Sequence, residues 1–216
     1  MTKDSPRPSL QDASTSNPHT LLDSEVDSDD DHPPSMTGIS DRPVDILINA
    51  PQWQEDLSID FQSLIEKCLS VILQEVVQSK APFDLSVLLT NDDEIQKLNK
   101  NYRQKDQPTN VLSFESGAPI QTLAAQYKAA EAGEGTSVTR PIPLGDIALS
   151  YETLVRESQE QQKSFQDHFT HLIIHGILHL LGFDHELDFE AETMEALEIK
   201  LLKTYFNINN PYHTQD

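Results

Sequence analysis

Three histidines towards the C-terminal end of the chain have the spacing of a metal site. His175, His179 and His185 occupy positions one, five and eleven of the stretch HGILHLLGFDH, and Gly182 occupies position eight. This is the ligand spacing of the zinc-peptidase motif H-E-x-x-H-x-x-G-x-x-H, whose second position is a catalytic glutamate. Because Gly176 holds that position here, the stretch keeps the ligands and lacks the usual general base.

A single helix that carries His175 and His179 would bring both imidazoles to one metal ion. Residues four apart lie about 40° apart around a helix axis and about 6 Å apart along it. Gly182 is expected to supply a left-handed turn that ends the helix, after which the chain presents His185 as a third ligand. Three neutral histidines leave one coordination position open, as in catalytic zinc sites. The residues therefore predict one Zn²⁺ per chain.

The alternative is that these histidines are ordinary core or surface residues satisfied by hydrogen bonds. Each unpaired buried polar group costs about 1–3 kcal/mol, whereas tight zinc binding contributes about 10 kcal/mol or more. Three histidines at this spacing on an apolar helix therefore favour the metal site. His171 and His168 lie one and two turns before His175 and are expected to support the site or the core without binding the metal.

The missing glutamate weighs against a peptidase mechanism but not against hydrolysis. Zinc lowers the pKa of its bound water to about 7, so a nucleophile forms without a strong protein base. Asp184, beside His185, is a candidate catalytic residue that orients a ligand imidazole or accepts a proton. An ordinary turn carboxylate is the equal alternative for Asp184.

Four short apolar segments, separated by helical patterns, are expected to form the strands that support this helix. They lie at residues 44–49, at 83–90, within 107–114 after a turn marked by a proline, and at 144–150. Helices are expected over 58–79 with Ser58 as N-cap, over 92–103 behind Asn91, from about 151, over 164–182 and over 190–205. The order predicts an α+β domain, with a small four-stranded mixed sheet, about five helices, and the zinc site on a long buried helix and the turn after it.

The chain is expected to hold one domain, because 216 residues with 37% hydrophobic content bury one sizeable core. Residues 1–43 are rich in Ser, Pro and Asp without an apolar period, which predicts a disordered acidic tail. A functional alternative is an acidic arm that mimics nucleic acid or docks a basic partner. The domain is expected over 44–208, with a partly helical insertion at 115–143 and a flexible C-terminus at 209–216.

The net charge of −21 argues against a nucleic-acid partner, because phosphate binding depends on Lys and Arg. Residues 95–105 are the exception, since they hold four basic side chains and no acid: Lys97, Lys100, Arg103 and Lys105. The only cysteine, Cys68, forms no internal disulfide, which fits a reducing compartment. No signal peptide or membrane span is evident from the sequence, so a cytoplasmic location is expected.

The residues resemble the YbeY family of metal-dependent endoribonucleases. The stretch HGILHLLGFDH matches its H-G-x-L-H-L-x-G-[YF]-D-H signature, and the resemblance continues through LNKNYRQKDQPTNVLSF, LGDIALS and EAETMEALE. It spans roughly residues 44–205 without the 115–143 insertion. It implies zinc bound by His175, His179 and His185, cleavage of single-stranded RNA, and a role in 16S rRNA 3′-end maturation and late small-subunit assembly and quality control. The implied partners are ribosomal RNA, the small subunit and its proteins.

The functionally important arginine of that family falls on Arg103. A guanidinium holds a phosphate in bidentate fashion and stabilises charge on a transferring phosphoryl group. Lys97, Lys100 and Lys105 would extend a phosphate-binding strip, although basic residues at a helix end are also explained by its dipole. Asn110 and Ser113 belong to the same block and are expected to line the cleft.

The chain departs from the family pattern at Glu115, where many relatives have proline, and in the long insertion and acidic tail. Two alternatives to a zinc endoribonuclease remain at this point. One is a ribosome-assembly factor with a structural metal, for which Asp184 or His171 would supply a fourth ligand. The other is a metallopeptidase, which Gly176 disfavours.

Overall fold

The computed structural model describes residues 43–55, 58–134, 140–185, 187–209 and 211–212. Most of the predicted acidic tail therefore lies outside the described residues, as do part of the loop that ends the predicted insertion and most of the C-terminus after 209. The boundaries predicted for these three segments stay predictions. Within the described ranges, no helix is long and apolar enough to cross a membrane.

Four strands form one mixed sheet in the order β1-β2-β4-β3. The strands β1 (Val44–Ile48), β2 (Phe83–Thr90) and β4 (Ile142–Ser150) run parallel, and β3 (Val111–Glu115) pairs antiparallel with β4. Apolar residues dominate β2 and β4, the two central strands, as in sheets covered on both faces. The four predicted strands and the mixed sheet are confirmed.

Seven α-helices within the described ranges connect and cover the sheet. They are α1 (Gln52–Glu55), α2 (Phe61–Ile72), α3 (Asp92–Arg103), α4 (Ile120–Glu131), α5 (Tyr151–Glu160), α6 (Phe165–Leu180) and α7 (Asp188–Phe206). A π-helical turn, Leu73–Val77, extends α2. The predicted α+β class is confirmed, and the two helices beyond the expected five are the single-turn α1 and α4, which forms in the predicted insertion.

The N-cap predicted for α2 is wrong. Asp60, not Ser58, holds this position, because its carboxylate accepts the backbone amide of Ser63 at 3.1 Å and the Ser63 hydroxyl at 2.7 Å. Both residue types are good N-caps, but Asp60 directly precedes the first apolar residue of the helix, Phe61. The predicted cap of α3 is confirmed, since Asn91 Oδ1 accepts the amide of Glu94 at 2.9 Å.

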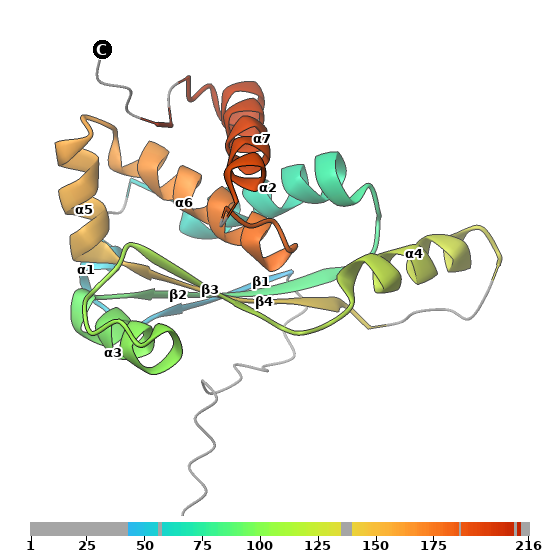
Figure 1. Cartoon of the computed structure of the whole chain (residues 1–216), viewed down its shortest axis with the longest axis horizontal. Coiled ribbons are helices and arrows are strands. Elements are labelled where there is room, and N and C mark those ends of the chain that lie inside the picture. The colour runs from blue at the N-terminus through green and yellow to red at the C-terminus, as the bar shows by residue number, and fades with distance from the viewer. Residues whose placement is uncertain (1–42, 56–57, 135–139, 186, 210, 213–216) are drawn as a thin grey trace, which may run out of the picture. The chain divides into compact units, whose positions relative to one another are not determined.

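Helices cover both faces of the sheet (Figure 1). The helix α3 lies on one face, where Ile95 packs with Leu112 and Ala148 in a small cluster. The helices α2 and α6 lie on the other face, over the main core to which Ile147 and Leu149 contribute. Successive residues of β4 thus serve opposite layers, as expected for a strand with a two-residue period.

Candidate metal centre

The helix α6 positions the first two histidines. Its first turn is capped by Ser164, whose Oγ accepts the amide of Asp167 at 3.0 Å. After Leu180 the chain turns at Gly182, whose φ of +88° is a left-handed conformation that favours glycine. Because the Gly182 amide donates to the His179 carbonyl at 2.8 Å, the turn is tied to the helix, and the left-handed turn predicted for Gly182 is confirmed.

The three predicted ligands converge. His175, His179 and His185 offer ring nitrogens that all lie within 4.8 Å of one another. The Nε2 atoms of His175 and His179 are 3.1 Å apart, near the roughly 3.3 Å between two nitrogens of a tetrahedral zinc site with bonds of about 2.0–2.1 Å. The ring of His185 lies 5.7 Å from that of His175 and 5.0 Å from that of His179, between centroids.

The remaining nitrogens of the two helical imidazoles face hydrogen-bond acceptors. His175 Nδ1 lies 2.8 Å from Glu198 Oε1, and His179 Nδ1 lies 2.9 Å from the carbonyl oxygen of Phe183. Since these oxygens only accept, both Nδ1 atoms carry the proton, and the Nε2 atoms face each other with lone pairs. Two facing lone pairs repel unless a cation lies between them, so this donor set fits a metal ion.

The protonation state of His179 also suits a ligand. Burial, and then the nearby charges of His175 and His185, lower the pKa of His179 to about 4. The imidazole is therefore neutral at neutral pH, which is the form that binds a metal.

Glu198 is a residue of the site that the sequence prediction missed. Its carboxylate is fully buried and accepts hydrogen bonds from His175, from His171 Nε2 at 3.0 Å and from the Tyr212 hydroxyl. Burial alone would raise the pKa of Glu198, but the hydrogen bonds from His171 and His175 lower it to about 2. One available signal was its place on the buried stripe of α7, with Met194 and Leu201, where an acid is uncommon.

Gly176 has a packing role. A Cβ atom built there would lie 2.9 Å from Ile147 Cδ1 and 3.1 Å from Ser113 Oγ, so this side of α6 touches β3 and β4. The Ser113 hydroxyl also donates to the Gly176 carbonyl at 3.3 Å. The position of the peptidase glutamate therefore faces the sheet, and a side chain there would force the buried Ile147 to shift. Ser113 lies beneath α6 and is not among the residues of the cavity wall described next.

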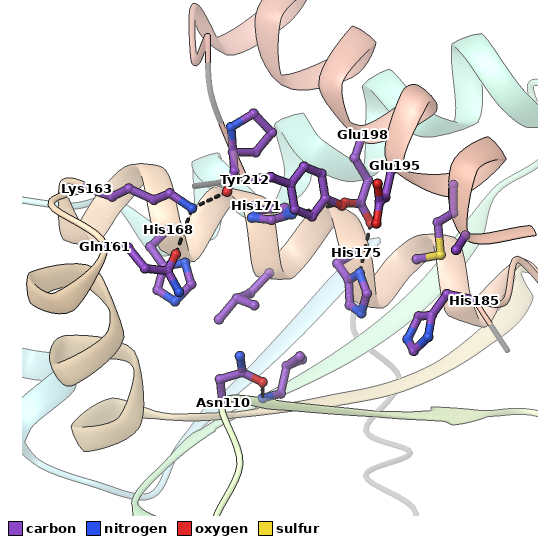
Figure 2. A pocket seen from close by; sticks show the side chains of 15 residues that line it. Asn110, Gln161, Lys163, His168, His171, His175, His185, Glu195, Glu198 and Tyr212 are labelled. Carbon is purple, nitrogen blue, oxygen red and sulfur yellow. Dashed lines mark hydrogen bonds and ion pairs between the residues drawn. The ribbon is translucent and has the colours of Figure 1, made fainter. Parts of the chain in front are cut away.

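A cavity of about 520 Å³ opens beside the histidines (Figure 2). His175 and His185 line one end, and Gln161 and Lys163 line the other. Asn110, expected to line the cleft, does so, and its amide donates to Glu157 Oε2 at 2.9 Å. The wall also includes residues from α6, α7 and the C-terminal segment: His168, His171, Leu172, Ala191, Met194, Glu195, Glu198, Pro211 and Tyr212, with Val111 from β3.

The two supporting histidines hold carboxylates and lie outside the ligand group. His168 Nε2 lies 2.9 Å from Glu157 Oε2, and His171 contacts Glu198 as described. His171 is thus joined to the ligand His175 through the carboxylate of Glu198, and the two rings also lie edge to face with centroids 6.4 Å apart.

The two predicted catalytic residues, Asp184 and Arg103, lie in different parts of the fold. Asp184 is exposed, and its Oδ1 accepts the backbone amide of its neighbour His185 at 2.7 Å. Arg103 is the last residue of α3, is exposed, and does not belong to the cavity wall. The structure thus places Asp184 beside a ligand and Arg103 on a helix of the opposite sheet layer.

Two lysines of the predicted basic strip are paired with acids. Lys97 Nζ lies 2.7 Å from Glu94, and Lys100 Nζ lies 2.8 Å from Asp106, both as exposed pairs. Arg103 and Lys105 form no ion pair with any residue in the described ranges. Exposed pairs are weak, yet they reduce the positive potential of the strip and leave Arg103 as its most available cation together with Lys105.

Comparisons with known proteins find relatives that match most of the chain. The solution structure of TM1509 from Thermotoga maritima is 21% identical with a TM-score of 0.43, over 76% of this chain and 92% of that chain. A protein named endoribonuclease YbeY from Bradyrhizobium diazoefficiens is 39% identical over 168 residues, which cover 78% of this chain and 84% of that protein. One of the same name from Rhodopseudomonas palustris is 40% identical over 172 residues, 80% and 82% of the two chains. Since residues 47–206 also match the family model described as Endoribonuclease YbeY, the chain belongs to the endoribonuclease YbeY family.

Proposed function

We propose that this chain is a zinc-dependent endoribonuclease that cuts single-stranded RNA beside His175, His179 and His185. The observation that carries the proposal is the facing pair of histidine Nε2 atoms, with a third histidine beside them, at the end of a cavity. When bound, zinc supplies a Lewis acid that polarises a phosphoryl oxygen. The relatives named endoribonuclease YbeY support RNA as the substrate.

Asn110 and Arg103 would guide the RNA strand. Residues 104–110 lead from the end of α3 to Asn110 in the cavity wall, directly before the edge strand β3. A strand of RNA that crosses this edge would contact Arg103 on one side and the cavity on the other. Arg103 then holds a phosphate in bidentate fashion and neutralises charge that builds on the phosphoryl group. Asp184, exposed beside His185, is proposed to accept a proton or to steady that ligand.

The proposed biological substrate is the 3′ end of 16S rRNA during late assembly and quality control of the small ribosomal subunit in the cytoplasm. The family resemblance supports this assignment. The charge of the chain fits it, because a net charge of −21 repels free RNA and favours a site where basic ribosomal proteins lie close to the RNA.

The geometry gives less support to an assembly factor with a structural metal. Structural zinc normally has four protein ligands. Within the described ranges, the ligand group contains three histidines and no further His, Cys, Asp or Glu. His171, a candidate for the fourth ligand, already contacts Glu198 through Nε2. An open fourth position favours catalysis.

Cleavage of single-stranded RNA by purified, zinc-loaded protein tests the proposal. We expect His179→Ala to lose both zinc and cleavage. We expect Arg103→Ala to keep zinc and to lower kcat by about 100-fold or more, with Arg103→Lys in between because lysine lacks the bidentate fork. Arg140→Ala, which removes an exposed arginine away from the cavity wall, is the matched control and should cleave as the parent does.

Two results would contradict the assignments separately. Full activity in Arg103→Ala would remove Arg103 from the reaction while leaving the metal centre intact. A parent protein that holds zinc but cuts no RNA would refute the endoribonuclease proposal and favour the assembly factor.

A further inference from the structure

The contacts of Glu198 give this buried acid a specific role at the metal centre. We propose that Glu198 is a positioning residue that keeps the proton of His175 on Nδ1 and thereby sets the zinc affinity of the site. The inference rests on the proposed metal centre and extends it to a residue on α7 that is not itself a ligand.

The hydrogen-bond directions follow from the chemistry of a carboxylate. An ionised carboxylate only accepts, so His175 Nδ1, 2.8 Å from Oε1, carries a proton. His171 Nε2, 3.0 Å from Oε2, carries one for the same reason. Figure 2 shows Glu198 on the α7 side of His175, with Tyr212 beside it. The lone pair of His175 is therefore on Nε2, the nitrogen that faces His179.

The surroundings of Glu198 hold its carboxylate in place. The residue has no solvent exposure, and Met194, Leu201 and Leu202 on the same helix are buried with it. Its Oε2 accepts from His171 and from the Tyr212 hydroxyl, while among the described residues only His175 donates to Oε1. A fixed acceptor of this kind orients a ligand imidazole and raises its basicity.

Glu198→Gln is an informative variant because the two carboxylate oxygens accept different numbers of hydrogen bonds. Glutamine has nearly the same shape but offers one acceptor oxygen and one NH₂ group. We expect the amide oxygen of this glutamine to face the two donors, His171 and Tyr212, because only the oxygen can accept from them. The NH₂ group then faces His175. The imidazole of His175 must then move its proton to Nε2, which blocks the nitrogen that binds the metal.

Competition between the full-length protein and a zinc chelator measures this effect without RNA. We expect Glu198→Gln to weaken zinc binding by about 10- to 100-fold relative to the parent. Glu195→Gln is the matched control, because Glu195 lies one turn earlier on α7, lines the same cavity, is exposed and contacts no histidine through a hydrogen bond among the described residues. It removes the same charge and should keep zinc affinity within about threefold of the parent.

If the zinc affinity of Glu198→Gln stays within about threefold of the parent's, the proposal is wrong. If Glu195→Gln loses as much zinc affinity as Glu198→Gln, the proposal is also wrong, because the loss of negative charge alone would then explain the weaker binding. A parent that binds no zinc would refute the metal centre itself, whereas normal binding by both parent and Glu198→Gln would refute only the role of Glu198.

The parent protein offers a second test that does not depend on the variant folding. Nitrogen-15 NMR of the histidine rings reports which nitrogen carries the proton. We expect a protonated Nδ1 on His175, both before and after zinc is added, with zinc shifting the Nε2 resonance. A proton on Nε2 of His175, or zinc bound at Nδ1, would overturn the proposal.

Discussion

At the residue scale, Gly176 shows how packing and chemistry are divided along one helix. Its side of α6 meets Ile147 and Ser113, while His175 lines the cavity and contacts Glu198 of α7. The helix therefore approaches the sheet closely at the position where a peptidase carries glutamate. Close packing against the sheet therefore explains why position 176 does not carry a glutamate.

Gly176→Glu is expected to destabilise the protein severely and to create no peptidase. A larger side chain would displace Ile147 and bury an unpaired charge, which costs more than about 3 kcal/mol together. Ala196→Glu, at an exposed position of α7, is the control and should change the free energy of unfolding by less than about 0.5 kcal/mol. Urea denaturation measures both, and a stable Gly176→Glu protein would show that position 176 has room for a side chain.

The ligands could be predicted from the sequence because their spacing is local. His175 and His179 share one helix, and Gly182 marks the turn that returns His185. Glu198 could not be predicted in the same way, because its contact with His175 spans 23 residues and depends on how α7 packs against α6. Two signals pointed to it, its unusual place in an apolar stripe and its place at the end of the block EAETMEALE.

At the scale of helices and strands, caps and cross-links position the walls of the cavity. Glu157 on α5 contacts Asn110, which precedes β3, and His168 on α6. One carboxylate thus joins three segments, and two of its partners, Asn110 and His168, line the cavity.

Glu157 is expected to make stability depend on pH. Burial alone would raise its pKa, but hydrogen bonds from His168 and Asn110 lower it below the ordinary 4.5. Because the unfolded chain then binds more protons, this stabilisation is complete above about pH 4.5 and is lost as pH falls through the folded pKa. Glu157→Gln should flatten this decline in zinc-free protein. Urea denaturation at several pH values measures the slope, and Glu160→Gln, an exposed acid on the same helix, should retain it.

The cap of α3 gives a second prediction at this scale. Asn91→Ala should cost about 1 kcal/mol of unfolding free energy, whereas Asn91→Asp keeps an acceptor for the Glu94 amide and should cost little. Chemical denaturation distinguishes them, and equal stability of the two variants would contradict the role of the cap.

The interiors of the helices and the strands could be predicted from apolar periodicity. The first residue of a helix could not be predicted in this way. Ser58 and Asp60 are both good caps by residue type, and only the position of the first packed residue, Phe61, decides between them. The single turn α1 is too short to show a period. It forms because Trp53 is buried against Phe61, Tyr151, Phe165 and Phe169, contacts that no local pattern contains.

At the scale of the whole molecule, the N-terminal residues differ from the rest of the chain in charge and lie before the part that matches the family. Residues 1–45 hold ten acidic and three basic side chains, and the family model begins at residue 47. We expect a chain that lacks residues 1–42 to keep the parent's zinc content and urea midpoint. Loss of either would show that the acidic segment contributes to the domain.

The central claim, that RNA cleavage depends on a metal held by the three histidines, is tested most directly by restoring zinc to metal-free protein. The rate of cleavage should be negligible without zinc, rise in proportion to added zinc, and stop rising at about one ion per chain. Undiminished cleavage by the metal-free protein, or a rate that keeps rising well beyond one ion per chain, would contradict it.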